Sequence, residues 1–188
     1  MKLMPTCRIA HRIWLTAWPV TLPAASHAQQ IAIGEYPTPV VTIPQSITTG
    51  PDGALWFAGN GGMGRLTTAA AITQYALPGN DGSPFGIVAG PDGALWFAKQ
   101  GDANHPDAIG RITTAGAITE YPTQGGPVGI TSGGDGALWF TLESGNAVGR
   151  ITTAGAITQY PLPTASTLPQ SITAGPDGAL SQKSLVAR

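Results

Sequence analysis

The chain repeats one seven-residue phrase at a nearly constant spacing. PDGALWF stands at residues 51–57 and 91–97, returns at residues 134–140 with its first residue changed, and is shortened to PDGAL at residues 176–180. The aspartates of the four copies lie 40, 43 and 42 residues apart (Asp52, Asp92, Asp135 and Asp177). A fixed period of this length indicates a repeat architecture, in which each copy is one structural unit. The chain is therefore predicted to fold as several copies of one unit.

Two further phrases keep the same spacing and complete the unit. GRLTT at residues 64–68 is followed by AITQY at residues 71–75, and both recur with small changes in the next two units. Together with residues 46–50 and 54–58, these segments are typical of four short strands bounded by Gly, Pro and Asp. The turn Pro51-Asp52-Gly53 joins the first two strands, because Pro presets φ, Asp bonds the backbone and Gly accepts a positive φ.

Four short antiparallel strands in every 40 or so residues predict the blade of a β-propeller. Leu55 and Phe57 point to one face of the second strand and Trp56 to the other, as expected of a blade covered on both faces. No segment of the mature chain shows the 3.6-residue period of a helix. We predict an all-β fold, a β-propeller of four-stranded antiparallel blades with about three complete blades plus partial ones, and hence an incomplete ring. A β-sandwich or an open β-solenoid is the alternative.

The repeats span residues 29–180, and residues 181–188 form a tail without the repeat pattern. Complete blades are expected at about residues 44–75, 84–121 and 127–160. A lone outer strand at residues 31–36 precedes them, and two inner strands near residues 171–173 and 179–180 follow, which together could build part of a fourth blade. Unpaired strand edges invite pairing between chains. We therefore expect self-association through open blade edges.

The first 28 residues follow a different pattern. A basic start is followed by the apolar run of residues 13–25 and by Ser26-His27-Ala28, which places small residues before a cleavage point. This is the pattern of a secretory signal peptide, although a disordered leader is the alternative. The mature chain is predicted to begin at Gln29 and to be secreted or periplasmic. No later segment approaches the length of a membrane span.

Removing the leader changes the charge and the thiol content of the chain. Lys2, Arg8 and Arg12 leave with it, so six basic residues remain against ten acidic ones, a net charge of about minus four. The single cysteine, Cys7, also leaves, so the mature chain has no disulfide and no thiol nucleophile. A surface without a basic patch does not favour nucleic acid as a partner.

Each unit carries one Trp and one Arg in register: Trp56, Trp96 and Trp139, and Arg65, Arg111 and Arg150. Because every blade has a copy, we interpret the tryptophans as packing residues, with a ligand cage as the alternative. Each arginine is expected to pair with a turn carboxylate or to stack on an aromatic ring. A ring of arginines that gathers an anion is the other possibility.

The combined phrases resemble a known family. GPDGALWF at residues 90–97, IGRITTAGAITEYPT at 109–123 and GPVGI at 126–130 are similar to segments of the streptogramin B lyases, also called virginiamycin B lyases. The resemblance covers residues 31–180. It implies a seven-bladed propeller that linearises a cyclic depsipeptide antibiotic by elimination at its ester bond, with a divalent metal such as magnesium. It also implies that the partner is a small-molecule cyclic peptide or lactone.

The resemblance further implies a histidine base after the proline of the Pro-x-Gly-Ile phrase and a glutamate after a Trp-Phe-Thr strand. In this chain the histidine position holds Gln45, Phe85, Val128 and Gln170. The glutamate position holds Gly59, Lys99 and Leu142, with Glu143 one residue later. We therefore expect little or no lyase activity from this chain. The alternative function is a non-catalytic secreted module that binds a ligand or a protein.

One loop differs from its equivalents in the other units. Residues 98–109, AKQGDANHPDAI, concentrate Asp102, Asn104, His105 and Asp107. Oxygen ligands at alternating positions could hold a hard cation, with His105 as a nearby base. A solvated insertion is the competing interpretation, because loops are polar and variable by default. Glu143 is the remaining candidate for ligand or metal binding.

Overall fold

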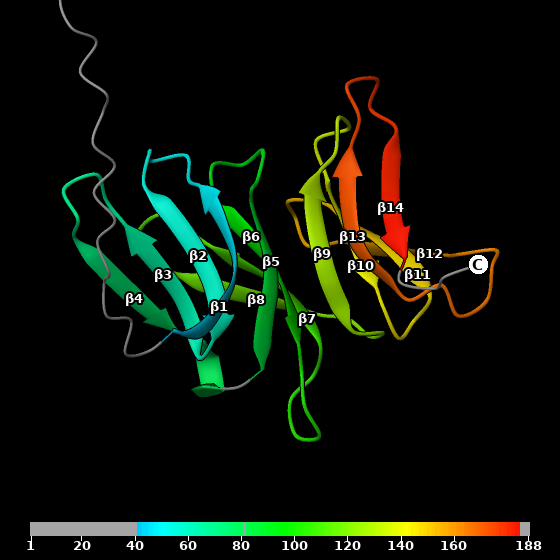
Figure 1. The fold of residues 1–188 in the computed structure, drawn as a ribbon, viewed down its shortest axis with the longest axis horizontal. Helices are drawn as coiled ribbons and strands as arrows, with labels where there is room; N and C mark the ends of the chain where they lie inside the picture. Colours follow the sequence, from blue (N-terminus) through cyan, green and yellow to red (C-terminus); the bar gives the residue numbers. More distant parts are fainter. Residues whose placement is uncertain (1–40, 81, 185–188) are drawn as a thin grey trace, which may run out of the picture. The chain divides into compact units, whose positions relative to one another are not determined.

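The computed structural model describes residues 41–80 and 82–184 of the chain, so the predicted signal peptide and the predicted strand at residues 31–36 lie outside the described residues. The described part contains three four-stranded antiparallel sheets and one two-stranded sheet (Figure 1). It contains no α-helix. The predicted all-β propeller fold, with three complete blades and a partial one, is confirmed.

Each blade runs through its four strands in sequence order. Blade 1 consists of β1 (Thr42–Thr49), β2 (Leu55–Asn60), β3 (Gly62–Leu66) and β4 (Ile72–Ala76), followed by the short 3₁₀ helix η1 (Pro78–Asn80). Blade 2 consists of β5 (Ser83–Ala89), β6 (Leu95–Gln100), β7 (Ala108–Ile112) and β8 (Ile118–Pro122). Blade 3 consists of β9 (Pro127–Ser132), β10 (Leu138–Leu142), β11 (Ala147–Ile151) and β12 (Ile157–Pro161). The partial blade 4 consists of β13 (Pro169–Ala174) and β14 (Leu180–Ser184).

The repeated phrase forms the turn and the second strand of each blade, as predicted. In blade 1, Gly53 has φ of 74° and its N–H donates to the Gly50 carbonyl at 3.0 Å. Asp52 Oδ1 accepts a long hydrogen bond from the Ala54 N–H at 3.4 Å, which fixes the same turn from its side chain. The left-handed conformation at Gly53 costs a residue with a Cβ more than it costs glycine. The sequence of the turn therefore determines where β2 begins.

The blades pack face to face along the chain. Their first strands, β1, β5, β9 and β13, are neighbours in that order (Figure 1). Leu95 and Phe97 of blade 2 share a buried cluster with Trp56 of blade 1. Phe140 of blade 3 shares the next cluster with Trp96 of blade 2. Each second strand is thus buried on both of its faces where a neighbour is present, which explains its continuous apolar sequence.

Two faces of the described blades are left open. In blade 1, Ile47 is 61% exposed and Leu55 is 40% exposed, whereas the equivalent Leu95 of blade 2 is fully buried. At the other end, Trp139 of blade 3 is half-buried, while Trp56 is fully buried. Blade 4 covers blade 3 with only two strands. Its second strand nevertheless continues to Ser184, beyond the predicted end of the repeats at residue 180.

None of the helical turns in residues 41–80 and 82–184 is long and apolar enough to cross a membrane.

Candidate functional site

An Asp–Trp–Arg–Tyr contact recurs in the three complete blades. In blade 1, Asp52 Oδ1 accepts a hydrogen bond from the Trp56 indole at 3.0 Å, and Oδ2 accepts one from Arg65 Nε at 2.6 Å. The Trp56 ring stacks on Tyr75 with 5.6 Å between centroids. Blades 2 and 3 repeat the ion pair at 2.6 and 2.7 Å, between Arg111 and Asp92 and between Arg150 and Asp135.

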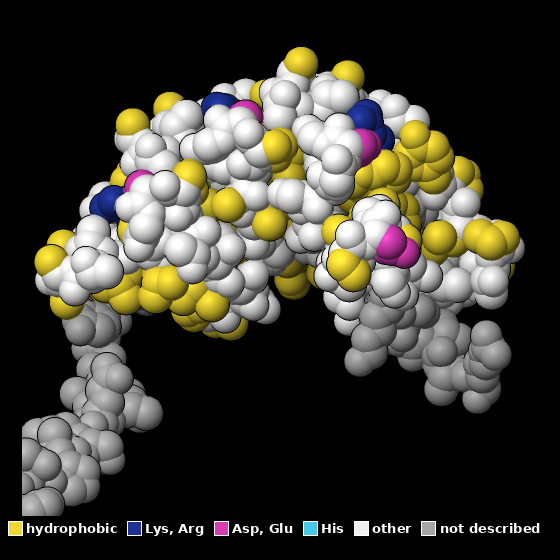
Figure 2. All heavy atoms as spheres, turned by 90° about the horizontal axis from the view of Figure 1, so that it is seen from above, with side chains coloured by type: hydrophobic (Ala, Val, Ile, Leu, Met, Phe, Trp, Pro, Cys, Tyr) yellow, Lys and Arg dark blue, Asp and Glu magenta, His cyan; other side chains and the backbone are white. Residues whose placement is uncertain are grey.

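The repeated arginines therefore bind the turn carboxylates of their own blades, which confirms the first of the two interpretations drawn from the sequence. Figure 2 shows basic side chains lying directly against acidic ones on the face that it displays. The tryptophans of blades 1 and 2 are packing residues, since both are fully buried.

The hydrogen bonds hold these carboxylates in their ionised form. Burial alone raises the pKa of Asp52, but the hydrogen bonds from Trp56 and Arg65 outweigh it, so the pKa lies below its ordinary value. For Asp135 the hydrogen bond from Arg150 is the largest cause of a lowered pKa. A carboxylate whose pKa is lowered by folding contributes stability above its ordinary pKa and loses it as the pH falls through the lowered value. The contacts consequently persist at neutral pH.

In the loop of residues 98–109, Asp102 organises its own surroundings. Its Oδ1 accepts the backbone N–H of Asn104 at 2.8 Å and that of His105 at 3.0 Å, and lies 2.9 Å from His105 Nδ1. The backbone N–H of Asn104 is the largest cause of the lowered pKa of Asp102. The side chain of Asp102 therefore closes a local turn, a common role for an aspartate in a polar loop.

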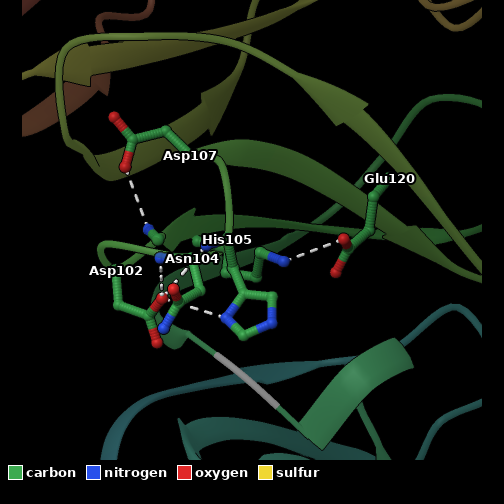
Figure 3. Close-up of polar contacts among 7 residues, drawn as sticks. Asp102, Asn104, His105, Asp107 and Glu120 are labelled. Atoms are coloured by element: carbon green, nitrogen blue, oxygen red, sulfur yellow. Dashed lines mark hydrogen bonds and ion pairs between the residues drawn. The ribbon is translucent and has the colours of Figure 1, made fainter.

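Asp107 is only two residues from His105, but its carboxylate accepts hydrogen bonds from other backbone groups than Asp102 does. Its Oδ1 accepts the N–H of Gly101 at 2.9 Å, and its Oδ2 accepts the N–H of Gly126 at 2.8 Å. Asp107 thus ties the loop of blade 2 to the segment that enters β9. In Figure 3, Asp102 and His105 face each other, whereas Asp107 points to a backbone partner of its own.

The described residues do not fit a divalent metal. Across residues 41–80 and 82–184, no three His, Cys, Asp or Glu side chains gather as a group that could hold an ion. Both oxygens of Asp107 and one oxygen of Asp102 already accept N–H groups. Magnesium prefers several free oxygen ligands in octahedral geometry. A metal site in this loop stays a prediction.

Glu143 lies outside the loop of residues 98–109, where blade 3 meets blade 4. Gln170 Nε2 donates to Glu143 Oε1 at 2.9 Å, and the backbone N–H of Glu143 donates to the Gly126 carbonyl at 3.0 Å. Gln170 is the second residue of the inner strand β13 and occupies the position where the resemblance implies the histidine base. The structure therefore brings Glu143 and this position together, while it keeps Glu143 out of the cluster around Asp102.

Sequence reasoning did not find this contact, since it joins residues 27 positions apart in different blades. The register of the repeats was the available signal. The second strand of each blade lies beside the first strand of the next blade, as β10 lies beside β13. Glu143 directly follows β10, and Gln170 is the second residue of β13. Their proximity could have been inferred once the blades were aligned.

A buried ion pair was also missed. Lys99 is 1% exposed, and its Nζ lies 2.8 Å from Glu120 Oε2. Lys99 lies on β6 opposite Ala108, and Glu120 lies on β8 opposite Gly110, so the ion pair spans the strand β7. The sequence signal was that both residues of the pair differ from the corresponding residues of blade 3, which are Leu142 and Gln159.

The fold and the repeat together define a β-propeller protein built on a unit of about 40 residues. The positions where the resemblance implies a histidine base hold Gln45, Phe85, Val128 and Gln170, none of which takes up a proton at neutral pH. A model of the Virginiamycin B lyase family matches residues 6–187. The chain belongs to the virginiamycin B lyase family.

Solved structures agree with this assignment. Two crystal structures of virginiamycin B lyase from Staphylococcus aureus are each 43% identical to the chain, with TM-scores of 0.71 for the selenomethionine form and 0.72 for a catalytically inactive histidine-to-alanine variant with quinupristin. Each match covers 79% of this chain and 51% of the other. A streptogramin B lyase structure is 38% identical, with a TM-score of 0.65, and the match covers 77% of this chain and 55% of that one. The chain therefore spans about half the length of these proteins. Curated protein sequences gave no significant match.

Proposed function

We propose that this chain binds a cyclic depsipeptide or lactone of the streptogramin B type and does not open its ring. Membership of the virginiamycin B lyase family and the likeness to a protein solved with quinupristin support the choice of ligand. The observation that carries the proposal is the Glu143–Gln170 hydrogen bond, because an amide occupies the position where the resemblance implies a base.

Elimination at an ester needs a group that removes a proton within hydrogen-bond reach of the substrate. The amide of Gln170 cannot accept a proton at neutral pH, and it engages one oxygen of Glu143. His105 lies on the loop of residues 98–109, next to Asp102. Carboxylate and amide groups suit hydrogen bonds to the peptide groups of a ligand, so the pair fits binding better than proton transfer.

The proposed place of action is outside the cytoplasm, as a secreted or periplasmic protein, because residues 1–28 carry the signal pattern. The exported chain is then expected to begin at Gln29. An intact mass that still includes residues 1–28 would contradict export by this route. Magnesium is implied by the family resemblance alone, and the described carboxylates do not supply its ligands.

Calorimetric titration with quinupristin tests the binding proposal. We expect measurable heat with the wild-type chain, and we expect Glu143→Ala to weaken binding by about tenfold or more, since a hydrogen bond to a charged group is worth roughly 1.5–3 kcal/mol. Asp102→Ala is the matched control, because it removes a carboxylate from the loop cluster and should leave the affinity unchanged. Equal affinities of the wild type and Glu143→Ala would refute the site, and no heat with the wild type would refute the binding function.

We also propose that copies of this chain associate through an open blade edge. The outer edge of β14 has no strand beside it among the described residues, whereas every other second strand is paired on both sides. Such an edge presents unsatisfied N–H and C=O groups to another chain.

A further inference from the structure

The turn before β14 keeps the aspartate of the Asp–Arg contact that the complete blades form. Asp177 forms the same turn as the other repeat aspartates: its Oδ1 accepts the N–H of Ala179 at 3.0 Å, and Gly175 N–H donates to the Ala179 carbonyl at 2.7 Å. In the three complete blades, this aspartate receives an arginine from the third strand. Blade 4 has no third strand among the described residues, so the acceptor is present without its blade partner.

The pairing of the second and third strands in the complete blades shows which position must carry a basic residue to bind the repeat aspartate. In blade 1 the third strand places Arg65 directly opposite Trp56, and from there it binds Asp52. Blade 3 repeats the arrangement with Arg150 opposite Trp139. The position of blade 4 equivalent to Trp56 is Ser181. A strand added to β14 would therefore complete the contact if it carried a basic residue opposite Ser181.

We infer that the added strand is β14 of a second copy, paired antiparallel about a two-fold axis at Gln182. In that register each Ser181 stands opposite residue 183 of the other copy, and residue 183 is a lysine. The same register applies twice because the axis relates the two copies. The sequence thus supplies a basic residue at the position that arginine holds in the complete blades, on both sides of the axis.

Gln182 itself suits the axis. Its Oε1 is enclosed and has no hydrogen-bond partner among the described residues. With its side chain turned toward the open edge, Gln182 can exchange amide hydrogen bonds with a second Gln182 directly opposite. In the complete blades the equivalent phenylalanine excludes a side chain on the opposite strand, since a Cβ added at Gly110 would lie 2.0 Å from the Phe97 ring. Glutamine in place of phenylalanine removes that obstacle.

The resulting dimer would have a continuous four-stranded sheet, β13–β14 of one copy followed by β14–β13 of the other. Its interface is isologous, so the same edge serves both copies and the pairing stops at two. The ladder bonds satisfy the backbone of the open edge. This dimer rests on the proposed self-association and specifies which edge and which register it uses.

Disulfide trapping in the full chain tests the register. In a Cys7→Ser background, Gln182→Cys should form a covalent dimer under mild oxidation, because directly opposite residues have Cβ atoms about 4.5–5.5 Å apart. Ser181→Cys is the matched control, since its own counterpart is diagonal, about 7–8 Å away, and it should cross-link poorly. The yield is read on a non-reducing gel. Asp177→Lys, measured by sedimentation, should weaken association by about tenfold, because like charges are then brought together.

The outcomes separate the two proposals. A dimer that is trapped by Gln182→Cys and not by Ser181→Cys supports both. Association without that selectivity, or with no effect of Asp177→Lys, overturns this register and leaves self-association standing. A wild-type chain that sediments as a monomer at every concentration overturns both.

Discussion

Trp96→Ala is expected to lower the free energy of unfolding by about 3–5 kcal/mol, the range for truncating a large buried aromatic. Trp96 is fully buried between blades 2 and 3, and its indole donates to Asp92 at 2.9 Å. Its ring also stacks on Tyr121 with 5.6 Å between centroids. The substitution therefore opens a cavity in the core and removes a partner of a repeat aspartate at the same time. Urea unfolding followed by circular dichroism measures the loss.

Trp139→Ala provides the matched control for this prediction. Trp139 makes the same contacts within its own blade, with a 3.2 Å hydrogen bond to Asp135 and a 5.6 Å stack on Tyr160. It is only half-buried, and Tyr160 is 46% exposed, because blade 4 covers blade 3 incompletely. The loss at Trp139 should be clearly smaller than the loss at Trp96. Equal losses would show that contacts within a blade, rather than burial between blades, determine the stability.

Glu120→Gln should lower the free energy of unfolding by about 2–3 kcal/mol, the cost of removing a charged partner from a buried polar group. The substitution keeps the size of the side chain but deletes the negative charge 2.8 Å from the ammonium of Lys99. The Lys99 side chain is only 2% exposed, so water cannot replace the lost carboxylate without opening the interface between blades 1 and 2. Urea titration at neutral pH gives the difference.

The repeat itself supplies the control for the ion pair. Lys99→Leu combined with Glu120→Gln reproduces the pair Leu142 and Gln159 that blade 3 carries at these positions. Replacing a buried ion pair by apolar groups is often neutral or stabilising. The double variant should therefore recover most of the stability lost in Glu120→Gln. A double variant as unstable as the single one would mean that the blade interface requires the charge on Lys99.

The fold was predictable because every unit repeats the same local information. The turn at Pro51-Asp52-Gly53 fixes where one strand ends and the next begins, and the apolar residues on both faces of β2 require covering blades. The pairing of Arg65 with Asp52 could also be anticipated, since both recur in step. The strand β14 continues to Ser184, through residues that lack the repeat pattern. Backbone pairing with β13 extends the strand without the apolar side chains of the earlier copies.

The candidate site was harder to predict, because its contacts join residues that differ from the repeat. Asp102, His105 and Asp107 are close in sequence, yet backbone N–H groups on two sides of the loop bind the two carboxylates separately. Closeness along the chain therefore did not imply a shared ligand. Glu143 and Gln170 are distant in sequence but meet because blades 3 and 4 pack. The register of the aligned repeats is the signal that predicts such a pair.

The central proposal is that this chain binds a ligand of the streptogramin B type without opening its ring. Incubation of the purified chain with quinupristin and magnesium, followed by mass spectrometry, tests it directly. The cyclic compound should remain intact, since general-base assistance typically contributes about 10²–10⁴ in rate and the four positions where the resemblance implies a histidine hold Gln45, Phe85, Val128 and Gln170. Accumulation of the linear product, at a rate that falls in Glu143→Gln or His105→Ala, would contradict the claim and identify the catalytic base.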